Sequence, residues 1–126
     1  MTLQQVLDEI DEKKANTMSL ARKLKYISDV EGKVHAEILM KHEHDAEDET
    51  CPVYDEDTNA DETEMLVPDI YADLYIYYVL IKIDEDHQEE DKESNNRVRF
   101  KNAWDDFACY WTREHMPLQP ARYYIL

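Results

Sequence analysis

The stretch DLYIYYVLIKID, residues 73–84, limits the possible folds of this chain more than any other segment. Between its two aspartates, nine of ten residues are apolar or aromatic, and Lys82 is the exception. Aromatic and β-branched residues favour a strand, but the apolar segment extends back to Ile70 and lacks two-residue alternation. The apolar positions instead follow helical spacing, in one stripe of Ile70, Leu74, Tyr77 and Ile81 and a neighbouring stripe of Tyr71, Tyr75 and Tyr78. We therefore predict a helix that opens at Pro68 and Asp69.

Two amphipathic helices are predicted on the N-terminal side of this stretch. The first has Thr2 as its N-cap and one apolar face, made of Leu3, Val6, Leu7 and Ile10. The second begins after Ser19 and is expected to reach about Lys41. Its apolar stripe consists of Leu20, Leu24, Ile27, Val30, Val34 and Ile38.

A fourth helix is predicted after the polar run DEDHQEEDKESNN, residues 84–96. A turn near His87 and Gln88 would separate it from the preceding helix, and Pro117 would end it after His115. Its main stripe contains Phe100, Ala103, Trp104, Phe107 and Trp111. At helical rise it would be on the order of 40 Å long. Because its first half is polar, we expect a helical hairpin that projects from a bundle.

Glycine is nearly absent, which excludes several classes of site. With Gly32 as the single glycine, neither a P-loop nor a dinucleotide-binding G-x-G-x-x-G turn is possible. Few glycines also mean few tight hairpins, which favours helices over a β sandwich. The predicted fold is mainly α: a small bundle of about four helices in one domain, residues 1–116, with an acidic loop at 43–66. Residues 117–126, with two prolines, are predicted to form an extended tail.

Negative charge dominates the composition and limits the possible partners. The net charge is -16, and residues 43–64 hold eleven acids and no Lys or Arg. Such a chain is poorly suited to grip DNA, since affinity for phosphates comes largely from Lys and Arg. No stretch reaches the roughly 18 apolar residues of a membrane helix, and the acidic N-terminus does not resemble a secretory signal. We expect a cytosolic protein with two reduced thiols, Cys51 and Cys109.

Three motifs superficially indicate metal chemistry. Residues 55–66 resemble a calcium-binding loop, but Ala60 replaces the required glycine and Leu66 the final glutamate. Residues 89–93 match the E-E-x-x-E pattern of all-helical nucleotide pyrophosphohydrolases, but no partner E-x-x-D follows. His42 and His44 lack a third ligand fixed by the sequence. We therefore predict no catalytic, cofactor-binding or metal-binding residue and no enzymatic activity.

The tyrosines of the apolar stretch allow two interpretations. Tyr71, Tyr75 and Tyr78 could belong to the core. They could instead line a subunit contact, where tyrosine is favoured because its ring is apolar and its hydroxyl can reach water. A helix that is apolar nearly all round must be buried on every side. Three other helices of modest size are expected to be too few to cover it, which favours an oligomer.

Two segments resemble one protein family. They are EMLVPDIYADLYIYYVLIKID and NNRVRFKNAWDDFACYWTREHMP. The shared pattern is V-P-x-x-Y-x-x-L-Y-I-Y-Y, an acidic turn, N-N, F-x-x-A-[WY] and a closing T-R-x-H-M-P. Over Val67 to Pro117 the chain resembles the head–tail connector, or head-completion adaptor, proteins of long-tailed bacteriophages and prophages. Relatives are expected to turn at Gly or Asn, where this chain has His87 and Gln88.

The resemblance implies a structural virion protein in the neck of the particle, present in the host cytoplasm during assembly. About twelve copies would form a ring that binds the portal protein and a stopper or tail-completion protein and extends the DNA channel. The implied hairpin core and subunit contacts are Tyr71, Leu74, Tyr75, Tyr77, Tyr78, Ile81, Phe100, Trp104, Phe107 and Trp111. The implied portal-binding tail is Arg122, Tyr123, Tyr124, Ile125 and Leu126, which could add a strand to a portal edge.

Acidic side chains that face the channel would repel DNA and let it pass without a specific site. The candidates are Asp55, Asp57, Asp61, Glu89 and Glu90. Two other functions fit parts of the sequence. An acidic inhibitor that mimics DNA would account for the charge but not for the apolar hairpin. An all-α metal-dependent nucleotide hydrolase would account only for the E-E-x-x-E motif.

Overall fold

The computed structural model describes residues 1–116 and 118, and within this part the protein is mainly helical. The described residues form four α-helices, three short 3₁₀ turns and one isolated β-bridge between Thr2 and Glu64. The predicted fold class is confirmed. The proposed portal-binding tail, Arg122–Leu126, lies outside the described residues.

The first two helices begin at the predicted caps. Helix α1 spans Leu3–Lys13, and the Thr2 hydroxyl accepts a hydrogen bond from the Gln5 N–H in a capping box. Helix α2 spans Leu20–Glu37 and begins after Ser19, whose hydroxyl accepts from the Arg22 N–H. It ends four residues before the predicted Lys41, because Leu39–Lys41 tighten into a 3₁₀ turn.

The opening stretch of the sequence forms a helix and not a strand. A 3₁₀ turn at Asp69–Tyr71 precedes helix α3, which spans Asp73–Asp86. The prediction that Ile70 shares a stripe with Leu74 is wrong: Ile70 is 82% exposed. The 3₁₀ turn causes this, because it has a different residue spacing from the helix and ends before the helix begins.

Helix α4 spans Glu90–Glu114 and runs back along α3 as the predicted hairpin. Its 25 residues correspond to about 38 Å at helical rise. The turn lies at His87 and Gln88, as expected, and Gln88 has a positive φ of 57°. This left-handed conformation is the one that glycine or asparagine adopts at lower cost.

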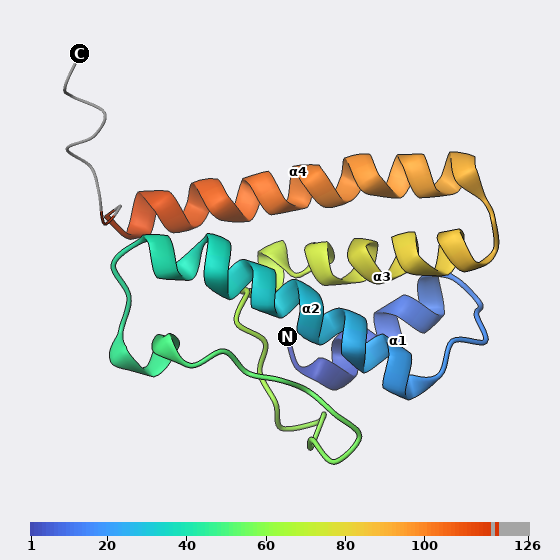
Figure 1. The fold of residues 1–126 in the computed structure, drawn as a ribbon, viewed down its shortest axis with the longest axis horizontal. Coiled ribbons are helices and arrows are strands. Elements are labelled where there is room, and N and C mark those ends of the chain that lie inside the picture. The colour runs from blue at the N-terminus through green and yellow to red at the C-terminus, as the bar shows by residue number, and fades with distance from the viewer. Residues whose placement is uncertain (117, 119–126) are drawn as a thin grey trace.

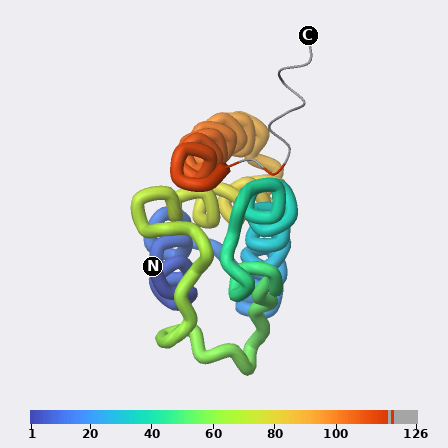
Figure 2. Tube along the Cα trace, turned by 90° about the vertical axis from the view of Figure 1, so that its left-hand side faces the viewer, coloured from blue at the N-terminus to red at the C-terminus, as the bar shows by residue number. Residues whose placement is uncertain are grey.

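The four helices pack in three layers, with α3 in the middle (Figure 1). Helix α4 covers one side of α3, and α1 and α2 lie side by side on the other, as the end view shows (Figure 2). The hairpin therefore does not project from the bundle. The chain itself covers the apolar circumference of α3, so this feature no longer requires neighbouring subunits.

Residues 43–66 form the predicted acidic connection along the lower edge of the molecule (Figure 1). Apart from a 3₁₀ turn at Ala46–Glu49, this connection contains no helix. It is nonetheless anchored, since the Tyr54 and Met65 side chains are buried in the core. These two apolar contacts fix an otherwise polar segment against α2 and α3.

Candidate functional site

The aromatic residues of the hairpin divide into buried and half-buried groups. The fully packed members are Leu74, Tyr75, Ile81 and Phe107, and the half-buried ones are Tyr71, Tyr77, Tyr78, Phe100, Trp104 and Trp111. The first group builds the core of the protein and is not accessible to a partner. Only the second group still has surface that a neighbouring protein could contact.

The half-buried aromatic residues gather at two places along α3 and α4. Near the middle of the hairpin, the Phe100 ring lies 5.5 Å from Tyr78 and 5.9 Å from Trp104, measured between centroids. Toward the end of α4, Tyr71 stacks on Tyr110 at 5.0 Å. Such contacts add about 0.5–1.5 kcal/mol each beyond the burial of apolar area. Tyr110 is absent from the predicted set, although it lies three residues after Phe107 on the same helix.

The acidic candidates do not form one surface. Asp55, Asp57 and Asp61 are exposed on the acidic connection, whereas Glu89 and Glu90 lie at the α3–α4 turn. Asp55 and Asp57 lie against α2, where they line a pocket with Ala21 and Lys25, and Asp61 follows Ala60 near the start of α1. The Gln4 N–H donates to the Ala60 carbonyl at the N-terminal end, and Lys14 pairs with Glu89 beyond the C-terminal end.

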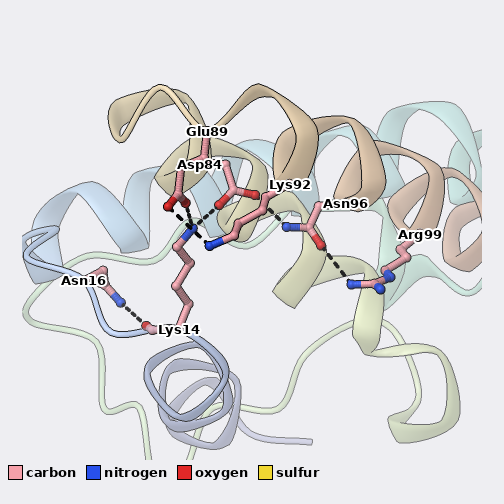
Figure 3. Close-up of polar contacts among 7 residues, drawn as sticks. All are labelled: Lys14, Asn16, Asp84, Glu89, Lys92, Asn96 and Arg99. Carbon is pink, nitrogen blue, oxygen red and sulfur yellow. Dashed lines mark hydrogen bonds and ion pairs between the residues drawn. The ribbon is translucent and has the colours of Figure 1, made fainter.

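A polar cluster that the sequence did not reveal joins α1, α3 and α4 (Figure 3). The fully buried Asp84 carboxylate accepts hydrogen bonds from Lys14 Nζ and, at 2.6 Å, from Asn96 Nδ2. Lys14 Nζ also donates to Glu89. Burial works against the Lys14 charge, but the hydrogen bonds with the two carboxylates outweigh it and raise its pKa. The hydrogen bond from Lys14 lowers the pKa of Glu89.

A second buried carboxylate, Glu31 of α2, holds the acidic connection in place. It accepts hydrogen bonds from the Tyr75 hydroxyl at 2.5 Å, the Tyr54 hydroxyl at 2.8 Å and the Leu66 N–H at 3.2 Å. Burial raises the pKa of Glu31, and these hydrogen bonds only partly oppose that effect. Burial and the nearby Glu31 charge also raise the pKa of both tyrosine hydroxyls. The only signal in the sequence is that Glu31 lies on the apolar stripe, four residues after Ile27.

The residues of the three metal-like motifs have other partners. The Asp55 carboxylate caps a local turn by accepting from the Asp57 N–H at 2.9 Å and the Thr58 hydroxyl at 3.2 Å. In the E-E-x-x-E motif, Glu93 pairs with Arg97 at 2.7 Å. His42 Nδ1 lies 2.7 Å from the Ile38 carbonyl. Within residues 1–116 and 118, no group of three or more His, Cys, Asp or Glu side chains is arranged to hold a metal ion.

Comparison with protein-family models, curated proteins and solved structures finds no match to this chain. In the described part of the chain, no helix is both long enough and apolar enough to cross a membrane.

Proposed function

We propose that this chain is a structural subunit of the ring that joins the portal vertex of a long-tailed phage or prophage capsid to its tail. Copies bind the portal protein on one side and a stopper or tail-completion protein on the other. DNA passes through the ring without a specific binding site. The subunit acts by shape and charge, and it has no catalytic role.

The convergence of the two resembling segments is the observation that carries this proposal. Residues 67–84 and 95–116 are joined by residues 85–94 and pack on each other along the hairpin. The motif residues make the contacts: the Tyr78 ring meets Phe100, Tyr71 lies 6.0 Å from Phe107, and Asn96 donates to Asp84. The pattern therefore describes one structural unit, which supports inheritance of a scaffold and not of a reaction centre.

The surface charge also supports a role as a DNA conduit. Asp55, Asp57 and Asp61 are exposed, and the surrounding residues 43–64 contain no Lys or Arg. Carboxylates that face a channel raise the energy of nearby phosphates and leave no deep minimum in which DNA would stick. Acidic groups elsewhere on the surface keep the subunit soluble at high concentration during assembly.

Co-sedimentation with assembled portal rings tests the proposal. The portal protein comes from the phage or prophage whose genome encodes this chain. We expect the full chain to sediment with the rings, and we expect a chain without residues 122–126 to stay in the supernatant. Both chains should give the same helical circular dichroism, since no described core residue is removed. Failure of the full chain to bind portal rings, with its fold intact, would contradict the proposal.

A further inference from the structure

A basic pocket lies where α1, α3 and α4 meet, next to the polar cluster. Its volume is about 530 Å³, and its lining includes Lys13, Lys14, Lys92, Arg99 and Tyr77. Asp84 is the single carboxylate among the lining residues. Four cationic side chains around one pocket are unusual in a chain with 14 basic and 30 acidic residues.

Two of these cations are not neutralised by the described part of the chain. Lys14 pairs with Asp84 and Glu89, and Lys92 lies 3.3 Å from Glu89. Lys13 and Arg99, in contrast, have no ion pair with a carboxylate of residues 1–116. Lys13 Nζ lies 5.9 Å from the centre of the Tyr77 ring, and Arg99 makes one long hydrogen bond, 3.5 Å, to Asn96. The pocket thus retains positive charge for an external anion.

The acidic connection offers a matching group. Asp55, Glu56 and Asp57 are exposed, and none of the three makes an ion pair with the described residues. Hydrogen bonds from the Asp57 N–H and the Thr58 hydroxyl to Asp55 hold this turn in a defined shape. The three carboxylates are therefore presented together on an ordered turn, which lowers the entropic cost of binding.

The pocket and this turn cannot meet within one copy of the chain. The acidic turn lies against α2, where Asp55, Glu56 and Asp57 line a separate pocket with Ala21 and Lys25. Hydrogen bonds from Leu3 and Gln4 to Thr63 and Ala60 hold the residues that follow this turn at the N-terminal end of α1. Lys13 and Lys14 lie at the other end of this 11-residue helix, about 16 Å away. Figure 1 shows the connection along the lower edge and the α3–α4 turn on the right.

We propose that the basic pocket binds the acidic turn Asp55–Asp57 of a second copy of this chain. The contact is head to tail, because each copy uses its pocket toward one neighbour and its acidic turn toward the other. Repeated contacts of this kind close into a ring when the rotation between copies permits it. This inference rests on the proposed function, and it names the contact between neighbouring subunits. In such a ring Asp55 and Asp57 would face the neighbouring subunit and not the channel, which leaves Asp61 as the channel-facing candidate of the acidic connection. A phosphate-bearing ligand would carry the same sign of charge as the acidic turn, so the test includes inorganic phosphate and a short DNA duplex.

Two full-chain variants test this contact. A turn-reversed chain carries Asp55→Lys and Asp57→Lys and keeps its pocket. A pocket-reversed chain carries Lys13→Glu and Arg99→Glu and keeps its acidic turn. Mixed together, they bring the unchanged pocket of the turn-reversed chain to the unchanged acidic turn of the pocket-reversed chain. The two reversed sites also carry opposite charges and can pair as well.

Amide chemical shifts of the ¹⁵N-labelled chains report where the contact forms. The measurement uses about 150 mM salt, where long-range repulsion is screened beyond roughly 8 Å. With labelled turn-reversed chain, unlabelled pocket-reversed chain should shift the amides around Lys13, Asn95 and Arg99. With the labels exchanged, the shifts should include residues 55–61. As a control, unlabelled turn-reversed chain should cause no shift in labelled turn-reversed chain, since neither of the two chains presents the acidic turn.

A matched charge change elsewhere on α4 tests whether the pocket itself is responsible for the binding. Arg113, like Arg99, is an exposed arginine of α4. Adding Arg113→Glu to the labelled turn-reversed chain should leave the shifts unchanged, whereas adding Arg99→Glu should weaken binding at least about tenfold. Dispersed spectra of every variant confirm folding.

Three results would overturn the inference. The first is the absence of pocket shifts at about 1 mM of folded partner. The second is an equal effect of Arg113→Glu, and the third is equal shifts with inorganic phosphate or a short DNA duplex. The proposed function is tested separately: a complete ring of the pocket-reversed chain on portal would refute this contact and leave the connector role intact.

Discussion

At the scale of single residues, two buried carboxylates connect parts of the chain that are distant in sequence. Glu31 joins α2 to the acidic connection and to α3, and Asp84 joins α3 to α1 and α4. A buried carboxylate is tolerated only when hydrogen bonds replace the water it has lost. Both sites are therefore more sensitive to substitution than the many exposed acids of this protein.

Replacing Glu31 by Leu removes the acceptor for two tyrosine hydroxyls and one backbone N–H. Each unpaired buried group costs about 1–3 kcal/mol, so we expect the free energy of unfolding to fall by at least about 3 kcal/mol. Glu31→Gln keeps an oxygen acceptor and should cost much less. Urea unfolding of the two variants measures the difference, and an equal loss for both would show that the hydrogen bonds do not matter.

The raised pKa of Glu31 makes its contribution depend on pH. In the window above its ordinary value of 4.5, the folded protein retains a proton that the unfolded chain has lost. The Glu31 contribution is therefore largest at low pH and declines as pH rises through the raised pKa. Relative to Glu31→Gln, the wild type should lose stability as pH rises from 4.5 through the raised pKa, by roughly 1.4 kcal/mol for each unit by which the pKa is raised. A constant difference across this range would contradict the assignment.

Removing Asp84 should break the polar cluster of Figure 3. The substitution Asp84→Ala leaves the Asn96 amide and the partly buried Lys14 without their shared acceptor, which should cost about 3 kcal/mol. Glu89→Ala is the matched control, because that carboxylate is about one-third exposed and its loss should cost less than about 1 kcal/mol. If urea unfolding shows similar losses of stability for the two variants, Asp84 is not the central member of the polar cluster.

At the scale of elements, Gly32 is a weak point in α2. No atom lies within 4 Å of the position that a Cβ would occupy there. Gly32→Ala should therefore raise the free energy of unfolding by about 0.5–1 kcal/mol, since alanine loses less backbone freedom on folding. The reverse change at exposed Ala36 of the same helix should lower it by a similar amount. A thermal midpoint that falls for Gly32→Ala would show an unseen clash.

The sequence predicted the elements well where the periodic pattern was long and the caps were distinct. Thr2 and Ser19 begin α1 and α2 as expected, and the α3–α4 turn falls at His87 and Gln88. Predictions from the sequence were less accurate where tertiary contacts determine the local structure. At Ile70, a short 3₁₀ turn changes the residue spacing before α3. The polar clusters could not be predicted, because Lys14 and Asp84 meet only when α1 packs against the hairpin.

At the scale of the whole molecule, the middle position of α3 changes the argument for assembly. The sequence indicated that α3 needs neighbours beyond its own chain, but α1, α2 and α4 already cover it. In the proposed ring, contacts between copies would instead use surface features: the half-buried aromatic residues, the basic pocket and the acidic connection. A folded monomer that associates only on its template is consistent with this arrangement.

Electron microscopy of portal rings incubated with the full chain tests the central claim most directly. We expect one additional ring of density on one face of the portal, coaxial with its channel, into which three-layered helical subunits fit. The pocket-reversed chain, examined in parallel, shows whether the ring depends on the proposed contact between copies. Portal rings without added density, in the presence of correctly folded chain, would contradict the connector role.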